Sequence, residues 1–318
     1  MRSATLSLTR SGPPMILSTD VPRWAVPLLP PCRYKGAKGG RTGGKSHFMA
    51  EQAVAKMAAD PSCKVVGIRE VQRSIDQSVK ALIEQKIKKL GVGHLFDIRR
   101  TAIRHKRGPG LMTFQGMQDH TAASIKGLED YDLALVEEAN QLSGNSLQLL
   151  TPTIRKQDSE IWFPWNPDQE ADAVDQFFAT NAGDPDFICV SVNIDQNPFV
   201  STTGWKEYTR AKARAEASPT EWEIFEHVWH GAYNVLSNAI IFAGKCVSQP
   251  FEPAPGWDGP YYGCDFGFAQ DPTTFSEWWT HGGDAYCRRD CGAVGLELDD
   301  TAEFARRNMP GIDMHVVR

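Results

Sequence analysis

The sequence predicts an α/β fold in which helices cover the faces of a mostly parallel β-sheet. Two observations indicate it: short apolar segments typical of strands alternate with helical segments, and glycine and proline mark the turns between them. A hydrophobic fraction of 41% over 318 residues is enough for a real core. At this length we expect one large domain and a second or partial one.

The expected strands are short and apolar or β-branched. In order they span residues 33–37, 63–69, 96–116, 132–140, 160–167 and 186–193, and the third range holds two strands joined at a Gly-Pro-Gly turn. The expected helices span residues 45–60, 74–91 and 205–233. In the helix over 74–91, Val79, Ile83 and Ile87 recur at helical spacing, and Gly91 is a stop signal.

A change in composition divides the chain near residue 250. Residues 247–259 have the proline and glycine content of a linker, and a new set of strands begins after them. We therefore expect an N-terminal arm, a first domain that includes a helical linker subdomain, a linker and a second domain, over residues 1–32, 33–246, 247–259 and 260–318.

Composition limits the kinds of partner and compartment. A net charge of -5 argues against a globally basic nucleic-acid coat, so any DNA contact must be local. Seven cysteines without a CxxC pair indicate reduced thiols in a cytosolic protein. No run approaches the roughly 20 apolar residues that a membrane span requires.

A glycine-rich loop carries the most specific pattern. Gly39, four residues and then Gly44-Lys45-Ser46 satisfy G-x-x-x-x-G-K-[ST], between an expected strand and an expected helix. Such a loop aims backbone N–H groups at phosphates, while the lysine reaches the β and γ phosphates and the serine hydroxyl coordinates Mg²⁺. The candidate nucleotide ligands are Gly39, Gly40, Arg41, Thr42, Gly43, Gly44, Lys45 and Ser46. The alternative is a solvent-exposed glycine turn.

An acidic strand end supplies the second part of a nucleotide site. Leu133–Val136 are four apolar residues that end in Glu137 and Glu138. In open α/β sheets, ligands bind at the carboxyl ends of the strands. Glu137 would then be the acid on the magnesium side, and Glu138 the general base for water. The alternative is a strand that ends in two solvated glutamates.

Three other patterns have two interpretations each. Residues 99–107 could contact DNA phosphates or form a solvated loop. His227 and His230 could bind a metal at their helical spacing, but packing or surface roles are favoured because no third ligand is evident. Cys287 and Cys291 could ligate zinc, but they fit no common zinc spacing.

Several motifs occur in one order along the chain: "RYKGAKGGRTGGKSH", "DLALVEEA", "IWFPWNP", "VNIDQNPF", "EHVWHGAYN" and "YYGCDFGFAQDPTTF". In this order they resemble the large terminase subunits of tailed double-stranded DNA bacteriophages, the motors that pump viral DNA into procapsids. The resemblance runs from about Val21 to the C-terminus, and residues 1–20 match none of its motifs.

The resemblance implies an ASCE-type P-loop NTPase that uses ATP and Mg²⁺. Arg41 matches a loop arginine that stabilises charge on the transferring phosphoryl group in cis, and Asn166 matches a motif that couples hydrolysis to movement. Tyr34 matches a position near the adenine. The family's acidic strand commonly ends in Asp-Glu, whereas this one ends in Glu137-Glu138, whose longer first carboxylate can still reach magnesium through water.

The second domain resembles the start of an RNase H-like nuclease. Asp265, in "GCDFGF", matches its first metal-binding aspartate, and Asp290 is a candidate second acid. Such nucleases bind two divalent ions, Mg²⁺ or Mn²⁺, with several carboxylates. The chain ends at Arg318, after the strand-like "MHVVR", so we expect the nuclease to be incomplete.

The resemblance implies an ATP-driven motor that moves double-stranded viral DNA into a procapsid. The implied partners are the DNA, the portal protein, a small terminase subunit and further copies in a ring, with no membrane. The implied location is the host bacterial cytoplasm, transiently at the procapsid portal. Two alternatives are another P-loop DNA-dependent ATPase, of helicase or recombination type, and an inactive remnant of a prophage gene.

Overall fold

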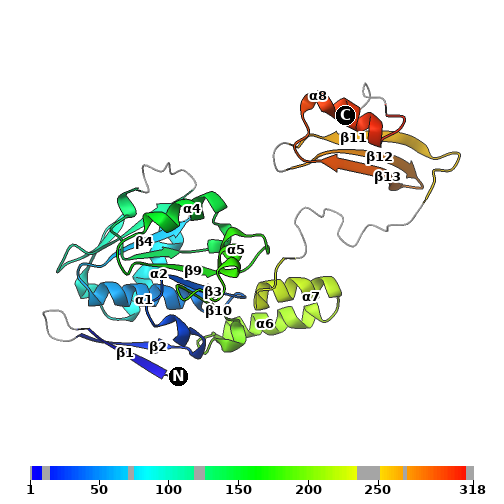
Figure 1. Ribbon diagram of the computed structural model, residues 1–318. Coiled ribbons are helices and arrows are strands. Elements are labelled where there is room, and N and C mark those ends of the chain that lie inside the picture. Colours follow the sequence, from blue (N-terminus) through cyan, green and yellow to red (C-terminus); the bar gives the residue numbers. More distant parts are fainter. Residues whose placement is uncertain are drawn as a thin grey trace. The chain divides into compact units, whose positions relative to one another are not determined.

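The computed structural model describes residues 2–8, 15–70, 75–117, 126–234, 251–267 and 271–312. The chain forms two compact units, residues 1–241 and 242–318, which are described separately (Figure 1). The division lies close to the expected linker at 247–259, of which residues 247–250 are outside the described ranges. The strand expected at "MHVVR" is also outside them.

The first unit is built on an eight-stranded sheet in the order β10-β3-β9-β8-β4-β7-β6-β5. Pairing is parallel from β10 to β7 and antiparallel from β7 to β5. The strands are β3 (Tyr34–Lys38), β4 (Lys64–Arg69), β5 (Phe96–Ile98), β6 (Ala102–His105), β7 (Leu111–Gly116), β8 (Leu133–Val136), β9 (Glu160–Trp165) and β10 (Phe187–Ser191). The mostly parallel sheet that the sequence predicts is therefore confirmed.

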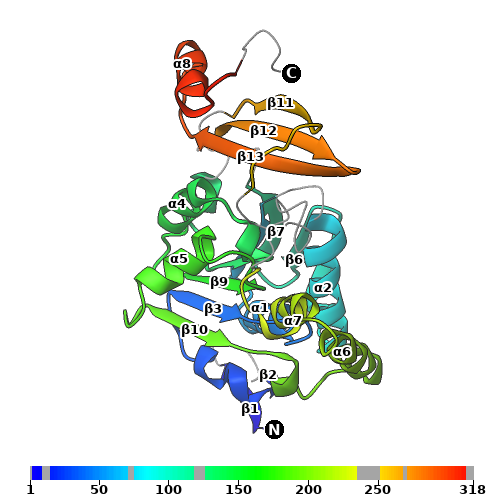
Figure 2. The same cartoon turned by 90° about the vertical axis from the view of Figure 1, so that its right-hand side faces the viewer.

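Helices cover both faces of this sheet (Figures 1 and 2). On one face lie α1 (Lys45–Ala59) and α2 (Ile75–Lys89), and on the other α4 (Gly144–Thr153) and α5 (Ala173–Thr180). The strand β8 shows why both faces are apolar. Leu133 and Leu135 join the core on the α1 side, whereas Ala134 and Val136 join the core on the α4 side.

Some elements differ from the sequence-based expectation. The segment 96–116 holds three strands rather than two, because β5 folds back on β6 before the turn into β7. Helices α4 and α5 are not among the predicted elements. The expected helix over 205–233 is a pair, α6 (Thr202–Ala215) and α7 (Pro219–Phe225), followed by the π-helix η7 (Glu226–His230).

The N-terminal residues join the first unit. Strands β1 (Arg2–Leu8) and β2 (Met15–Val21) form an antiparallel pair, followed by the short helix η1 (Arg23–Leu28). Trp24 and Leu28 of η1 are buried in the core beside α1, and the Trp24 ring packs edge-on against Phe48. The end of the expected N-terminal arm is therefore packed into the core of the first unit.

The second unit is a three-stranded antiparallel sheet in the order β11-β12-β13, with one helix. Its elements are β11 (Asp258–Asp265), β12 (Thr273–His281), β13 (Asp284–Ala293) and α8 (Leu298–Asn308). Phe275, on β12, packs against Ala305 and Met309 at the α8 side.

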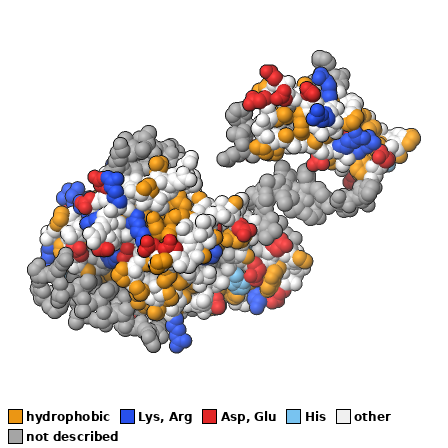
Figure 3. Space-filling model, viewed as in Figure 1, with side chains coloured by type: hydrophobic (Ala, Val, Ile, Leu, Met, Phe, Trp, Pro, Cys, Tyr) orange, Lys and Arg blue, Asp and Glu red, His pale blue; other side chains and the backbone are white. Residues whose placement is uncertain are grey.

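The surface agrees with the modest net charge. On the face of the first unit drawn in Figure 3, basic and acidic side chains are interspersed. Among the described residues, no helix has the length and apolar character needed to cross a bilayer.

We expect Leu150→Ala to destabilise the first unit far more than Leu149→Ala. Leu150 is fully buried in the core under α4, whereas its neighbour Leu149 is 39% exposed. Truncating the buried leucine should lower the free energy of unfolding by about 2–5 kcal/mol, and the exposed one by less than about 1 kcal/mol. Urea unfolding monitored by circular dichroism measures both, and equal losses would show that α4 does not pack as described.

Candidate nucleotide-binding site

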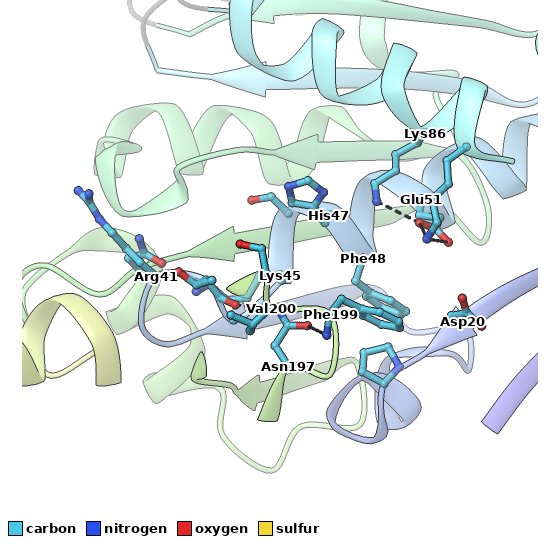
Figure 4. A pocket seen from close by; sticks show the side chains of 18 of the residues that line it. Asp20, Arg41, Lys45, His47, Phe48, Glu51, Lys86, Asn197, Phe199 and Val200 are labelled. Carbon is cyan, nitrogen blue, oxygen red and sulfur yellow. Dashed lines mark hydrogen bonds and ion pairs between the residues drawn. The ribbon is translucent and has the colours of Figure 1, made fainter. Parts of the chain in front are cut away.

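A cavity of about 920 Å³ opens at the carboxyl ends of the parallel strands. Its walls come from the loop after β3, the start of α1, the ends of β8 and β9, the segment before η1 and residues 197–201 (Figure 4). Arg41 and Asp20 lie at opposite ends of it. Asn166, directly after β9, and Glu138, after β8, also line the cavity, so the structure brings these sequence-predicted residues together.

The glycine-rich loop joins β3 to α1, as the sequence predicts. Gly39 has φ 136, and a Cβ built there would lie 2.1 Å from the Val192 carbonyl oxygen, so only glycine fits. Gly44 is the N-cap of α1 in the left-handed region, with φ 86. The loop therefore runs directly into the N-terminus of α1. The backbone N–H groups at such a helix start can bind phosphate.

Lys45 is the first residue of α1 and folds back over the loop. Its Nζ donates hydrogen bonds to the carbonyl oxygens of Gly39 and Gly40, at 2.8 and 2.6 Å. Burial lowers the pKa of Lys45 to about 7. A polyphosphate in the loop would favour the protonated ammonium by its negative charge.

Ser46 and Glu137 form a pair suited to a hard cation. The Ser46 hydroxyl donates to Glu137 Oε2 at 2.8 Å, and burial raises the pKa of Glu137 to about 7. Glu137 Oε1 is buried and has no hydrogen-bond partner among the described residues. A hydroxyl and an orphaned carboxylate oxygen fit the oxygen ligands that Mg²⁺ takes.

Glu138 is held by an arginine on the neighbouring strand. Its backbone is left-handed, with φ 52, and its carboxylate pairs with Arg69 at the end of β4. Because β4 lies on the side of β8 away from β3, this pair draws the carboxylate away from the phosphate loop. Sequence reasoning missed Arg69, since only the strand order places it beside Glu138.

Two asparagines that sequence reasoning did not assign support the loop. Asn193 Oδ1 accepts from the Gly40 N–H at 2.9 Å, and Asn197 Nδ2 donates to the Thr42 carbonyl oxygen at 2.7 Å. Both asparagines occur in "VNIDQNPF", which is one of the sequence motifs noted above. Their contact with the phosphate loop follows from the pairing of β10 with β3, which places the end of β10 beside that loop.

Tyr34 does not lie in the cavity, contrary to the expectation that it is near the adenine. It begins β3, at the end of the strand opposite to the phosphate loop, and stacks on Phe187 at 4.4 Å between ring centroids. It also contacts Phe177 edge-on. The residue is part of an aromatic cluster, because the strand carries it away from the carboxyl edge.

Single residues of two other sequence patterns have partners within the chain. Arg99 pairs with Asp97 at the start of the β5–β6 turn, in a solvated position. His230 contacts Glu226 and Tyr208, at 3.0 and 3.1 Å, within the helical pair and η7. No group of three or more potential metal ligands occurs among the described residues.

Asp265 and Asp290 lie in the second unit, on strands either side of β12. Asp265 on β11 pairs with Thr274 of β12, and Asp290 on β13 pairs with Ser276. Both aspartates therefore share one sheet face with β12 between them, roughly 12 Å apart by strand spacing and rise. Two-metal sites need carboxylates around ions about 4 Å apart. The assignment of Asp290 to the same metal site as Asp265 stays a prediction.

The comparison with known protein families decides the family. The family model described as phage terminase large subunit matches residues 32–231, which cover the phosphate loop, the acidic strand and the helical pair. The chain belongs to the phage terminase large subunit family. Both the mostly parallel sheet flanked by helices and the order of the motifs agree with this membership.

Individual relatives of this terminase chain are distant. It is 25% identical over 295 residues to the terminase large subunit of Bacillus phage SPP1, covering 85% of this chain but 66% of that protein. The chain thus spans slightly less than two thirds of that relative.

Solved structures share the fold. The HK97 bacteriophage large terminase has a TM-score of 0.56 at 15% identity and covers 98% of this chain and 71% of that one. The large terminase from a thermophilic bacteriophage, solved in complex with ADP, has a TM-score of 0.53 at 16% identity, with coverages of 93% and 74%.

We expect Arg69 and Glu138 to stabilise the terminase chain jointly. In a double-mutant cycle of Arg69→Gln and Glu138→Gln, urea unfolding should give a coupling of about 0.5–1 kcal/mol, discounted because Glu138 is half-exposed. The matched control is the exposed pair Arg155–Glu129, whose coupling should stay below about 0.3 kcal/mol. Equal couplings for the two pairs would contradict the described contact.

Proposed function

We propose that this chain binds and hydrolyses ATP as the motor of phage DNA packaging. The observation that carries the proposal is the convergence of Lys45, Ser46 and Glu138 on one cavity at the carboxyl edge of the sheet, with Glu137 hydrogen-bonded to Ser46 behind them. Family membership supports it. So does the large terminase of the thermophilic bacteriophage, which shares the fold and was solved with ADP and with ATP-gamma-S.

The side chains divide the work of phosphoryl transfer. Lys45 binds the β and γ phosphates, and Arg41, from the same loop, stabilises charge on the transferring group. Glu138 turns from Arg69 and accepts a proton from the attacking water. Ser46 and Glu137 would hold Mg²⁺, which neutralises charge on the phosphate oxygens when bound.

Residues other than Tyr34 are the candidates to contact the nucleobase. Pro22 is one of the residues that line the cavity. Phe48, from α1, and Phe199 and Val200, from the loop after β10, also line it (Figure 4). Phe199 is 49% exposed, so its ring has a free surface on which a base can stack. The base and ribose would lie along these apolar residues.

The motor would act on double-stranded DNA in the host cytoplasm, at the procapsid portal. Asn166, at the end of β9, would couple hydrolysis to movement. The portal protein, a small terminase subunit and further copies of the chain in a ring would be the partners. Asp265 would be a metal ligand of an RNase H-like nuclease, with Asp290 as the candidate second acid.

We expect Lys45→Ala and Glu138→Gln to separate binding from hydrolysis. Lys45→Ala removes the phosphate-binding ammonium, so turnover of ATP should fall at least about 100-fold. Glu138→Gln removes the base alone, so turnover should fall at least about 100-fold while nucleotide affinity changes less than about threefold. A coupled ATPase assay and calorimetric titration with ATP-γ-S measure both.

The matched controls are Lys88→Ala and Glu170→Gln, two exposed positions outside the cavity, which should leave turnover unchanged. Unchanged turnover in Lys45→Ala would overturn the phosphate-loop assignment. Efficient unwinding of forked DNA by the wild-type chain would favour a helicase over a packaging motor.

We expect Phe199→Ala to weaken recognition of the base and not of the phosphates. Loss of stacking should raise the KM for ATP about tenfold, while the inhibition constant of inorganic tripolyphosphate should change less than about twofold. Tyr34→Phe is the contrasting variant and should change neither constant. A KM that rises in Tyr34→Phe and not in Phe199→Ala would place the base at the other end of β3.

A further inference from the structure

The segment that follows the helical pair α6 and α7 contacts the phosphate loop. We call this segment, Glu226–Gly231, the linker seat; it consists of η7 and its C-cap. The Arg41 N–H donates a hydrogen bond to the Val228 carbonyl oxygen at 2.8 Å. The backbone of Arg41 is thus bound by a segment that lies far along the sequence from the loop.

The contact between the linker seat and the loop is backbone against backbone. A Cβ built on Gly40 would lie 1.8 Å from the Trp229 carbonyl oxygen. On the other side, a Cβ built on Gly231 would lie 2.5 Å from Gly39 Cα, and Gly231 has φ 70. Glycines on both surfaces therefore allow an approach that any side chain would prevent.

The linker seat is anchored at several points besides the loop. Tyr208 of α6 contacts His230 at 3.1 Å, which joins the seat to the helical pair. Just after the seat, the Asn234 N–H donates to the Asp168 carbonyl oxygen at 2.6 Å, in the segment that follows Asn166. The seat is therefore held between the helical pair and the end of β9.

We propose that the linker seat is a positioning element for Arg41, so that phosphoryl transfer depends on the seat being docked on the loop. This inference rests on the proposed ATP hydrolysis. Arg41 lines the cavity, and its backbone is fixed by a contact outside the phosphate cradle of Lys45 and Ser46. Docking of the linker seat then controls the rate of the chemical step. Nucleotide binding depends on Lys45 and Ser46 and not on the seat.

The test compares Gly231→Ala with Gly91→Ala. Gly91 has φ 69, nearly the same conformation, but nothing lies within 4 Å of a Cβ built there. Alanine is strained by the left-handed backbone to the same extent at both positions. Only in Gly231→Ala does the added Cβ collide with the phosphate loop and displace the seat. Gly231→Ala should lower kcat for ATP at least about tenfold with KM changed less than about threefold, and Gly91→Ala should change neither.

Two further measurements keep the outcome interpretable. Hydrogen–deuterium exchange of the peptide that contains Arg41 should be faster in Gly231→Ala than in the wild type and in Gly91→Ala, whether or not ATP is hydrolysed. Gly231→Asn, which tolerates the left-handed conformation but keeps the collision, should behave like Gly231→Ala.

Unchanged exchange in Gly231→Ala, or a kcat that falls equally in Gly91→Ala, would overturn the proposal. A wild-type chain that shows protected exchange at Arg41 but no ATP turnover would instead overturn the proposed function.

Discussion

Parallel pairing of β10, β3, β9 and β8 is the constraint on which the site depends, because it places the carboxyl ends of these strands at one edge. The loop after β3, Asn166 after β9 and Glu138 after β8 meet there although the chain separates them widely. The pairing is possible because β8 and its neighbours are apolar on both faces and are covered by helices on both.

Two buried ionisable side chains lie at the carboxyl edge of the sheet. Lys45 is buried over the loop's own carbonyl groups and Glu137 is buried beside Ser46, and burial moves the pKa of each toward neutrality. Such groups are poorly solvated on their own and gain charge stabilisation when an anion and a hard cation arrive together. Under the proposed function, the site would bind the nucleotide as its complex with Mg²⁺.

The helical pair after β10 is connected to the site by its last turn. Its C-terminal segment meets Gly39, Gly40 and Arg41 through backbone atoms, and the residues beyond it bond to the loop after β9. Backbones this close leave no room for a side chain between them, so the contact depends on glycine at both surfaces. The phosphate loop, the segment after β9 and the linker are therefore joined by direct backbone contacts within the first unit.

The sequence by itself determined the local features of this protein. The spacing of Gly39, Lys45 and Ser46 specified the phosphate loop, and the apolar run before Glu137 specified a buried strand, since both depend on neighbours in the chain. Features that depend on strand order could not be obtained this way. Tyr34 was expected near the base, yet β3 carries it to the opposite end of the sheet. Arg69 reaches Glu138, and the linker seat reaches Arg41, only because the tertiary structure brings distant segments together, and no local pattern encodes such a contact.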